Sequence, residues 1–288
     1  MASIPSPMMF DMTPQPNDGF EWAQAESGPA LRCGALLPLA AHLFTTRPWR
    51  LGSTTTVGAD DGWGEVAEAM QVDATHLARL HQVHGAAVVL ATARGRDALP
   101  PADIHLTRNT DLALAVQTAD CLPILLADTR TGAVAAAHAG WRGLAARVPE
   151  VVVGALARQF GSRPSDLVVA IGPSIGACCY EVGADVRDGM RVAGFSEGEL
   201  ERWFFDAPQP TAINPSLPAV RTERRAHHWF FDGWSAARAQ LERAGVPSGQ
   251  IHVASLCTAS HPDLFCSYRR DGRPSGRMAG VIRARSLG

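Results

Sequence analysis

Residues 118–143 read TADCLPILLADTRTGAVAAAHAGWRG and indicate how the middle of the chain folds. Two apolar runs of strand length, LPILLAD and AVAAAHAG, flank a turn candidate at Thr129–Gly132. The run DLALAVQTAD precedes them, and the three runs together predict an antiparallel meander. Cys121 and His138 stand at the edges of these runs, so they are either buried fillers or side chains brought together for chemistry.

The segments on either side of this stretch alternate between strand and helix patterns. Helical spacing predicts helices at 146–160 and 234–245. Short apolar runs predict strands at 40–47, 86–92, 167–176, 251–258 and 276–284. Because strands outnumber helices and many are neighbours in sequence, we expect an α+β fold with mixed or antiparallel sheets, not a doubly wound parallel sheet.

The N-terminal residues differ in composition from the rest of the chain. Residues 1–18 are rich in Pro, Met and Ser, and we expect them to form a flexible extension. No low-complexity linker divides the remainder, so residues 19–288 are expected to form a single domain.

The overall composition is that of a globular protein, with 46% hydrophobic and 19% charged residues. A formal net charge of −2 gives no reason to expect a nucleic acid or an anionic membrane as a partner. The sequence lacks a signal-peptide pattern and a membrane-length apolar run, which predicts a cytoplasmic location with mostly reduced cysteines. It also lacks GxGxxG and GxxxxGK[ST] motifs, so nucleotide-binding loops have no support.

Three side chains are candidates for a metal site: His84, Cys121 and His138. Two histidines and one cysteine form a known catalytic zinc set, which leaves a fourth position open for water or substrate. The alternative is structural, because a lone buried cysteine behaves as a small hydrophobe and a lone histidine is usually hydrogen-bonded. His81 lies close in sequence to His84, and we interpret it as a solvated polar residue.

A group of arginines is the second candidate feature. Arg47, Arg142 and Arg269 carry guanidinium groups, whose planar donors match phosphate and carboxylate oxygens. Arg142 also stands beside an expected helix start, where backbone N–H groups favour anions. Ordinary surface ion pairing is the alternative for each arginine taken alone.

Several longer motifs together resemble one family. The segments QVHG, TADCLPILLAD, HAGWRG, IGPSIGACCYEVG and SYRRDGRPSGRMAGVI resemble the bacterial laccase-domain family, also called the multicopper polyphenol oxidase or purine nucleoside phosphorylase family. The resemblance covers about residues 40–284. It implies a layered α/β sandwich with mixed, largely antiparallel sheets, similar to the cytotoxic-necrotising-factor fold. It also implies a metal site, usually zinc with copper as an alternative, on His84, Cys121 and His138.

The resemblance further implies enzymes that act on purine nucleosides and phosphate. The implied reactions are phosphorolysis of adenosine, inosine and S-methyl-5′-thioadenosine to free base and (methylthio)ribose 1-phosphate, and deamination of adenosine. Phosphorolysis needs anion holders, for which Arg47, Arg142 and Arg269 are the candidates. Deamination needs a general acid or base, and Asp120 or Glu181 are the candidates by their place in the motifs.

Three alternatives stay open on the sequence. Copper-dependent phenol oxidation would need many paired ligands, yet the ten histidines include no His-x-His, so a trinuclear copper cluster is implausible. A cysteine hydrolase, for example one that edits peptidoglycan precursors, would use Cys121 as nucleophile and His138 as base. A non-catalytic binding partner is the third. One departure from the family pattern is the segment after Arg47, which is shortened here and puts substrate contacts from that loop in doubt.

Overall fold

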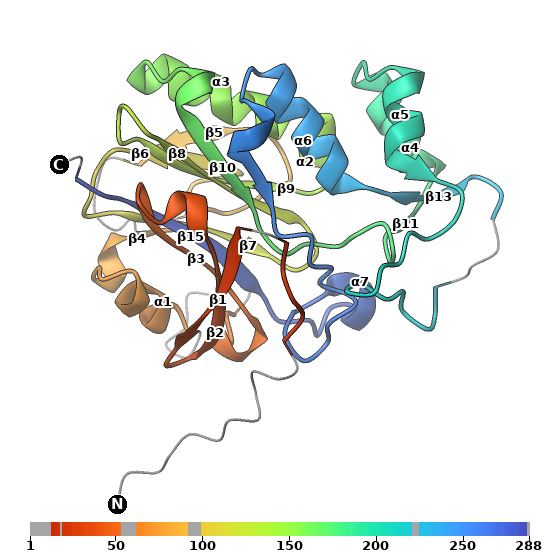
Figure 1. The fold of residues 1–288 in the computed structure, drawn as a ribbon, viewed down its shortest axis with the longest axis horizontal. Coiled ribbons are helices and arrows are strands. Elements are labelled where there is room, and N and C mark those ends of the chain that lie inside the picture. Colours follow the sequence, from red (N-terminus) through yellow and green to blue (C-terminus); the bar gives the residue numbers. More distant parts are fainter. Residues whose placement is uncertain (1–12, 18, 53–61, 92–98, 221–224, 287–288) are drawn as a thin grey trace, which may run out of the picture.

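The computed structural model in Figure 1 describes residues 13–17, 19–52, 62–91, 99–220 and 225–286. Most of the described strands belong to two six-stranded sheets. The first sheet has the order β1-β2-β3-β15-β7-β4, with bounds Phe20–Ala25, Gly28–Cys33, Ala40–Thr45, Met278–Ala284, Ala113–Thr118 and Leu77–Ala78. The second sheet has the order β14-β10-β8-β9-β6-β5, with bounds Ile251–Val253, Leu167–Ile171, Leu122–Asp128, Val134–Ala139, Ile104–Thr107 and Val88–Leu90.

A small sheet and seven α-helices complete the described part of the chain. The small sheet has the order β11-β13-β12, with bounds Glu181–Gly183, His228–Phe231 and Phe204–Phe205. The helices are α1 (Trp63–Ala69), α2 (Trp141–Ala145), α3 (Val148–Phe160), α4 (Ala184–Val192), α5 (Glu197–Trp203), α6 (Gly233–Arg243) and α7 (Tyr268–Asp271). Among the described strand pairs, β10–β14, β4–β7 and β5–β6 are parallel and the others are antiparallel. The expected α+β fold with mixed, largely antiparallel sheets is therefore confirmed.

The hydrophobic core is divided into layers by the two large sheets. Leu114 of the first sheet and Leu125 of the second belong to one buried cluster that fills the space between the sheets. On the outer face of the second sheet, Leu126 packs in a cluster with residues of α3 and α6, the helices drawn above that sheet in Figure 1. On the outer face of the first sheet, Ala115 packs in a cluster with α1. The result is a layered α/β sandwich.

The apolar runs of the sequence follow from this layering. Each central strand is covered on both faces, so alternate residues of β8 enter different clusters, with Ile124 toward the helices and Leu125 toward the first sheet. A strand covered on both faces has a continuous apolar sequence rather than an alternating one. The same reasoning accounts for LVVAI in β10, which is buried along its whole length.

The expected three-stranded meander is wrong in one respect. β8 and β9 form an antiparallel hairpin around the expected turn, and Gly132 has the positive φ of 69° that such a turn often requires. However, β7 pairs with β15 and β4 in the first sheet, not with β8. The chain crosses between the sheets over residues 119–121, where Asp120 has a φ of 95°. Hydrophobic patterning identifies a buried strand but does not specify its partner, which is why the crossing was missed.

The remaining expected elements are present with shorter bounds. β3, β10, β14, β15, α3 and α6 lie within or close to their expected ranges, and Pro149 stands in the first turn of α3, where a missing N–H costs nothing. β5 lies within the expected strand at 86–92. Most of the expected extension and residues 53–61 of the shortened loop lie outside the described residues. At the described end of the extension, the Asn17 amide nitrogen donates hydrogen bonds to Val253 and Ser255. No helix in the described ranges combines the length and apolar character that a membrane crossing needs.

Candidate active site

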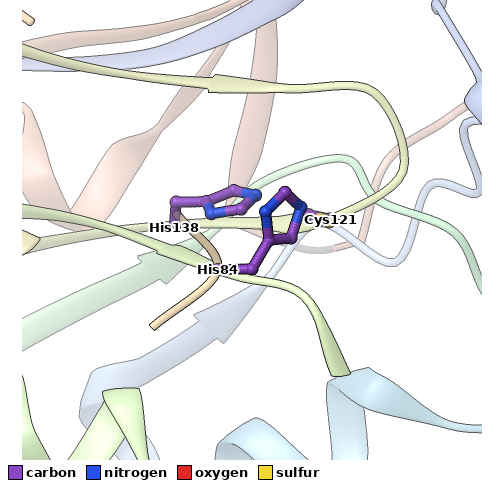
Figure 2. Close-up of side chains that lie close together, drawn as sticks. All are labelled: His84, Cys121 and His138. Atoms are coloured by element: carbon purple, nitrogen blue, oxygen red, sulfur yellow. The ribbon is translucent and has the colours of Figure 1, made fainter. Parts of the chain in front are cut away.

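The three candidate metal ligands come together at the crossing between the two large sheets. His84 lies in the loop between β4 and β5, Cys121 ends the crossing just before β8, and His138 lies on β9 opposite Pro123. One ligand atom from each side chain lies within 4.8 Å of the other two. Figure 2 shows the two imidazoles side by side, and their ring centroids are 4.9 Å apart in an edge-to-face arrangement. These three side chains therefore form a group that can hold a metal ion.

A buried carboxylate holds the His84 loop in place. Asp103, directly before β6, is fully buried and accepts hydrogen bonds from three successive backbone N–H groups. These are the N–H groups of Val83 at 3.2 Å, His84 at 3.1 Å and Gly85 at 2.7 Å. His84 itself has a φ of 59°, an uncommon conformation for this residue, so the loop depends on these contacts.

The same carboxylate orients the imidazole of His138. Asp103 Oδ1 lies 2.8 Å from His138 Nδ1, and the two backbones are joined by a 2.8 Å hydrogen bond from His138 N to the Asp103 carbonyl. This contact leaves Nε2 as the nitrogen available to a metal ion. Metal-binding histidines usually donate their other N–H to a carboxylate or carbonyl in this way. Asp103 was not among the residues expected from the sequence, although its place directly before the buried strand IHLT was a usable signal.

The electrostatics of the group favour a thiolate. Burial would by itself raise the pKa of Cys121, but the charge of His138 and hydrogen bonds from His138 and His84 lower this pKa to about 6. Burial also opposes protonation of His138, yet Cys121 and Asp103 raise the pKa of His138 to about 9. Burial would raise the pKa of Asp103 too, but the hydrogen bonds from His138 and from backbone N–H groups lower it. Cys121 is therefore held in the form that binds metals.

Gly140 has no side chain, and two of the ligands occupy the space where a side chain would lie. A Cβ atom at this position would lie 2.8 Å from Cys121 Sγ and 3.4 Å from His84 Cδ2. The φ of −78° at Gly140 is open to any residue, so backbone conformation does not explain the glycine. The close approach of the backbone to both ligands explains it, because a side chain would not fit.

The donor set fits a zinc ion. Zn–S and Zn–N bonds are about 2.3 Å and 2.0–2.1 Å long, so donors on one ion lie about 3.3–3.6 Å apart. The three donors, within 4.8 Å of one another, can reach this spacing by small side-chain rotations. His84 is exposed while His138 is buried, so the group opens on one side only. Three protein ligands with one open side are typical of catalytic rather than structural zinc sites.

The open side faces a cavity of about 430 Å³, which is within the usual size of small-molecule pockets. Its polar lining includes Gln82 and Gln117, which are joined by hydrogen bonds between the Gln82 side chain and the Gln117 backbone. Its apolar and aromatic lining consists of Ala119, Leu122, Trp141, Leu144, Ile175, Tyr180, Phe231 and Tyr268. Burial raises the pKa of Tyr180, so its phenol stays neutral.

Three arginines line this cavity: Arg142, Arg269 and Arg277. The guanidinium of Arg142 lies 4.3 Å from the ring centroid of Trp141, and that of Arg269 lies 5.0 Å from the centroid of Tyr180. Arg269 is also held by a 2.6 Å hydrogen bond from Nη1 to the carbonyl of Glu181. The structure thus brings two of the three expected arginines to the ligand group. It adds Arg277, which the sequence analysis did not single out.

Arg47 is not brought to the cavity, which corrects its expected role. Its guanidinium, with a side chain 51% exposed, donates to the carbonyl of Pro262 at 2.8 Å and lies 3.9 Å from Asp271. The expected anion site at a helix start beside Arg142 is also not supported. α2 spans only the five residues Trp141–Ala145, too short to build a substantial dipole.

The two candidate acids are engaged in other contacts. Asp120 Oδ1 accepts a hydrogen bond from Thr258 Oγ1, and Oδ2 accepts one from the Arg269 backbone N–H, both at 2.6 Å. Burial raises the pKa of Asp120, and these hydrogen bonds oppose the shift. The Glu181 carboxylate pairs with Arg225 at 3.2 Å and does not line the cavity. His81 is exposed, as expected.

Relatives of known name match most of the chain. A purine nucleoside phosphorylase of Bacteroides thetaiotaomicron is 32% identical over 223 residues, which cover 77% of this chain and 76% of the relative. A purine nucleoside phosphorylase of Deinococcus radiodurans is 36% identical over 253 residues, covering 84% and 88%. Adenosine deaminase RL5, from an unidentified prokaryote, is 33% identical over 227 residues, covering 76% and 79%.

The fold has a solved counterpart. The crystal structure of the hypothetical protein YfiH of Bacillus licheniformis superposes with a TM-score of 0.76 at 27% identity, covering 93% of this chain and 100% of that one. The sequence model of the family described as "Multi-copper polyphenol oxidoreductase laccase" matches residues 60–285, the part of the chain that contains all three ligands. With the matching relatives, this places the chain in that laccase-like family.

Proposed function

We propose that this chain is a purine nucleoside phosphorylase that holds a divalent cation, expected to be zinc, on His84, Cys121 and His138. One observation carries the proposal: the ligand group and three arginines face the same cavity of about 430 Å³. The names of two relatives that match more than three quarters of the chain support the substrate class. Adenosine, inosine and S-methyl-5′-thioadenosine are the proposed nucleosides.

The arginines are assigned to the phosphate. In phosphorolysis a phosphate oxygen forms a bond to C1′ of the ribose while the bond from C1′ to the purine nitrogen breaks. The attacking anion must therefore be held and oriented beside the sugar. Arg142 and Arg269 are already stacked on the aromatic rings of Trp141 and Tyr180, which limits the side-chain entropy that phosphate binding would cost.

The aromatic wall is assigned to the purine base. Trp141, Tyr180 and Phe231 present apolar surface beside the polar groups, as nucleoside recognition needs both. A neutral Tyr180 phenol keeps a donor available for the base, since burial raises its pKa. Asp120 is assigned to positioning, because its carboxylate joins the Cys121 turn to the backbone of Arg269.

The bound cation would supply Lewis-acid polarisation of an oxygen or nitrogen that gains charge during the reaction. The protein's part is to fix the ligands, and Asp103 does this for both histidines: it holds the His84 loop and the His138 ring. Adenosine deamination is proposed as a second reaction of the same cavity, in which a water oxygen bonds to C6 and ammonia leaves. Its support is the relative named adenosine deaminase.

The test is product analysis with and without phosphate. Each nucleoside is incubated with the wild-type chain and with Cys121→Ala, and free base and ribose 1-phosphate are quantified by chromatography. Cys33→Ala is the matched control, because Cys33 is a buried free cysteine outside the ligand group. We expect phosphate-dependent release of base, lost together with bound metal in Cys121→Ala and retained in the control. Base release that does not depend on phosphate, or that is retained by metal-free Cys121→Ala, would contradict the proposal.

A cysteine hydrolase is the second candidate, and one observation favours it. Cys121, His138 and Asp103 follow one another as nucleophile, base and orienting carboxylate, and the pKa of the Cys121 thiol is lowered to about 6. Metal content separates the two candidates, because a metal-bound sulfur is not a free nucleophile. If the active protein is metal-free and rapidly alkylated at Cys121, the hydrolase is correct. If metal protects Cys121 from alkylation, the phosphorylase proposal holds.

Phenol oxidation by a multicopper centre receives no support from the described residues, which include all ten histidines. Within those ranges only two clusters of possible ligands form, and only the one at Cys121 contains histidine. A trinuclear copper centre needs many imidazoles. Copper at the His84–Cys121–His138 group would be a replacement for zinc at the same three ligands.

A further inference from the structure

A second group of sulfur atoms lies outside the ligand group described above. Cys178, Cys179 and Cys257 are all buried, and their Sγ atoms lie within 4.8 Å of one another. We call these three residues the cysteine trio. Six free cysteines are present in the chain, and the trio brings half of them to one point.

The backbone places the trio in a fixed arrangement. Cys178 and Cys179 lie in the tight bend that follows Gly176, closed by a 3.0 Å hydrogen bond from Cys179 N to the Gly176 carbonyl. A Cβ on Gly176 would lie 2.7 Å from the ring of Trp234, so this bend is packed without spare room. Cys257 is joined to the same bend through a parallel bridge with Ser174. The three sulfurs are therefore held by two segments that tertiary structure ties together.

Polar groups lie close to all three sulfurs. The backbone N–H of Gly176 donates to Cys257 Sγ at 3.3 Å. Ser260 Oγ donates to the carbonyl of Pro215 at 2.7 Å, lies 3.5 Å from Cys178 Sγ and 3.6 Å from Cys179 Sγ, and is only partly buried. A hydrogen bond donated to a sulfur reduces the cost of burying an anionic centre.

We propose that the cysteine trio is a second metal site, separate from the His84–Cys121–His138 group, and that it takes a soft cation of low coordination number, with Cu(I) as the expected ion. Sulfurs about 2.3 Å from one shared ion lie about 3.8–4.0 Å apart, which the spacing of the trio allows. Thiolates select Cu(I) or zinc among biological metals.

The coordination number favours Cu(I) over zinc. Structural zinc sites are almost always four-coordinate, with nitrogen, sulfur or carboxylate ligands. In the described residues no histidine or carboxylate joins the three sulfurs of this cluster. Three soft ligands that share a buried cluster with Ile175 and Ala259 therefore match a three-coordinate Cu(I) ion. Binding exchanges thiol protons for the ion and needs no oxidant, since Cu(I) is supplied as such.

The experiment is an anaerobic Cu(I) titration of the full, reduced chain against a chromophoric Cu(I) chelator. It uses a background in which His84, Cys121 and His138 are all replaced by Ala, so that the first ligand group is removed. We expect one tightly bound Cu(I) per chain to remain, with an ultraviolet thiolate-to-metal band. Adding Cys257→Ser should weaken binding beyond the roughly 10–100-fold that loss of an outer-shell partner causes. Cys33→Ala, which removes a buried thiol outside the trio, should leave the affinity unchanged.

Two further measurements keep the proposal falsifiable. Circular dichroism and melting curves establish that each variant is folded, and Cys178→Ser replaces Cys257→Ser if the latter is unfolded. X-ray absorption on the Cu(I)-loaded background should show three sulfur neighbours and no imidazole. The proposal is overturned if the background binds no Cu(I), if removal of a trio cysteine leaves the affinity unchanged, or if fewer than two sulfurs surround the ion. A disulfide within the trio in the reduced, Cu(I)-treated chain would also overturn it.

Discussion

Replacing Asp103 by asparagine removes one charge and keeps the shape of the side chain. In the structure each carboxylate oxygen serves two donors: Oδ1 lies near the N–H of His84 and Nδ1 of His138, and Oδ2 accepts from the N–H of Val83 and Gly85. An amide offers only one acceptor oxygen, and its NH₂ group must face two of these donors. Asp103→Asn therefore loses two hydrogen bonds whichever way the amide turns.

The expected magnitude follows from these contacts. Hydrogen bonds to charged groups are worth about 1.5–3 kcal/mol each, so the free energy of unfolding should fall by about 3 kcal/mol at the low end of the range. Because Asp103 is fully buried, water cannot replace the lost partners. The affinity for the cation should fall about 10–100-fold, the usual cost of removing the carboxylate behind a histidine ligand.

Two assays check this prediction. Denaturant unfolding measures the stability, and competition with a chromophoric zinc chelator measures the affinity, with Asp111→Asn as control because Asp111 is an exposed aspartate before β7. Asp103→Asn should lose affinity and phosphorolysis together while still folding at low temperature, and Asp111→Asn should behave as wild type. A folded Asp103→Asn with wild-type metal affinity would refute the role of Asp103 in holding both histidines.

Three other predictions concern separate parts of the chain. Gly140→Ala puts a Cβ 2.8 Å from Cys121 Sγ, so metal content and activity should both fall, whereas Gly198→Ala, where a Cβ meets nothing within 4 Å, should leave both unchanged. Arg277→Gln should raise the KM for phosphate about 10–100-fold, as expected for loss of a charge-assisted hydrogen bond. An unchanged KM in steady-state kinetics would show that Arg277 does not bind phosphate. The fully buried His105 has no hydrogen-bond partner, and burial lowers its pKa from 6.5 to about 3. Because the unfolded chain takes up this proton first, the contribution of His105 to stability should be constant above about pH 7 and should fall by about 1.4 kcal/mol per pH unit below pH 6.5. His105→Phe should reduce the slope of stability against pH by this amount in unfolding experiments between pH 4 and 6.5, and an unchanged slope would contradict the prediction.

The fold class was accessible from the sequence because the strands are buried on both faces. LPILLAD and LVVAI are continuous apolar runs of strand length, and a layered sandwich is the architecture that covers such strands twice. The pairing of β7 was not accessible. A buried strand fits either sheet equally well on pattern alone, and the sheet it joins is set by the crossing at Asp120.

The site was accessible only in part, and for a chemical reason. His84, Cys121 and His138 come from three distant segments, so their spacing in the sequence follows no local rule. The resemblance to family motifs, rather than the spacing, predicted that they form one site. Asp103 and Arg277 act through contacts distant in sequence. Arg47 was expected in the site because its guanidinium could hold an anion, yet its side chain turns to Pro262 and Asp271.

The most direct measurement is elemental analysis of the purified chain and of Cys121→Ala, made on the same samples that are assayed for phosphate-dependent adenine release from adenosine. We predict that Cys121→Ala contains one equivalent less of divalent cation per chain than the wild type and releases no adenine. Equal metal content in the two proteins, or full adenine release by the metal-depleted variant, would contradict the claim that these three residues hold the catalytic ion.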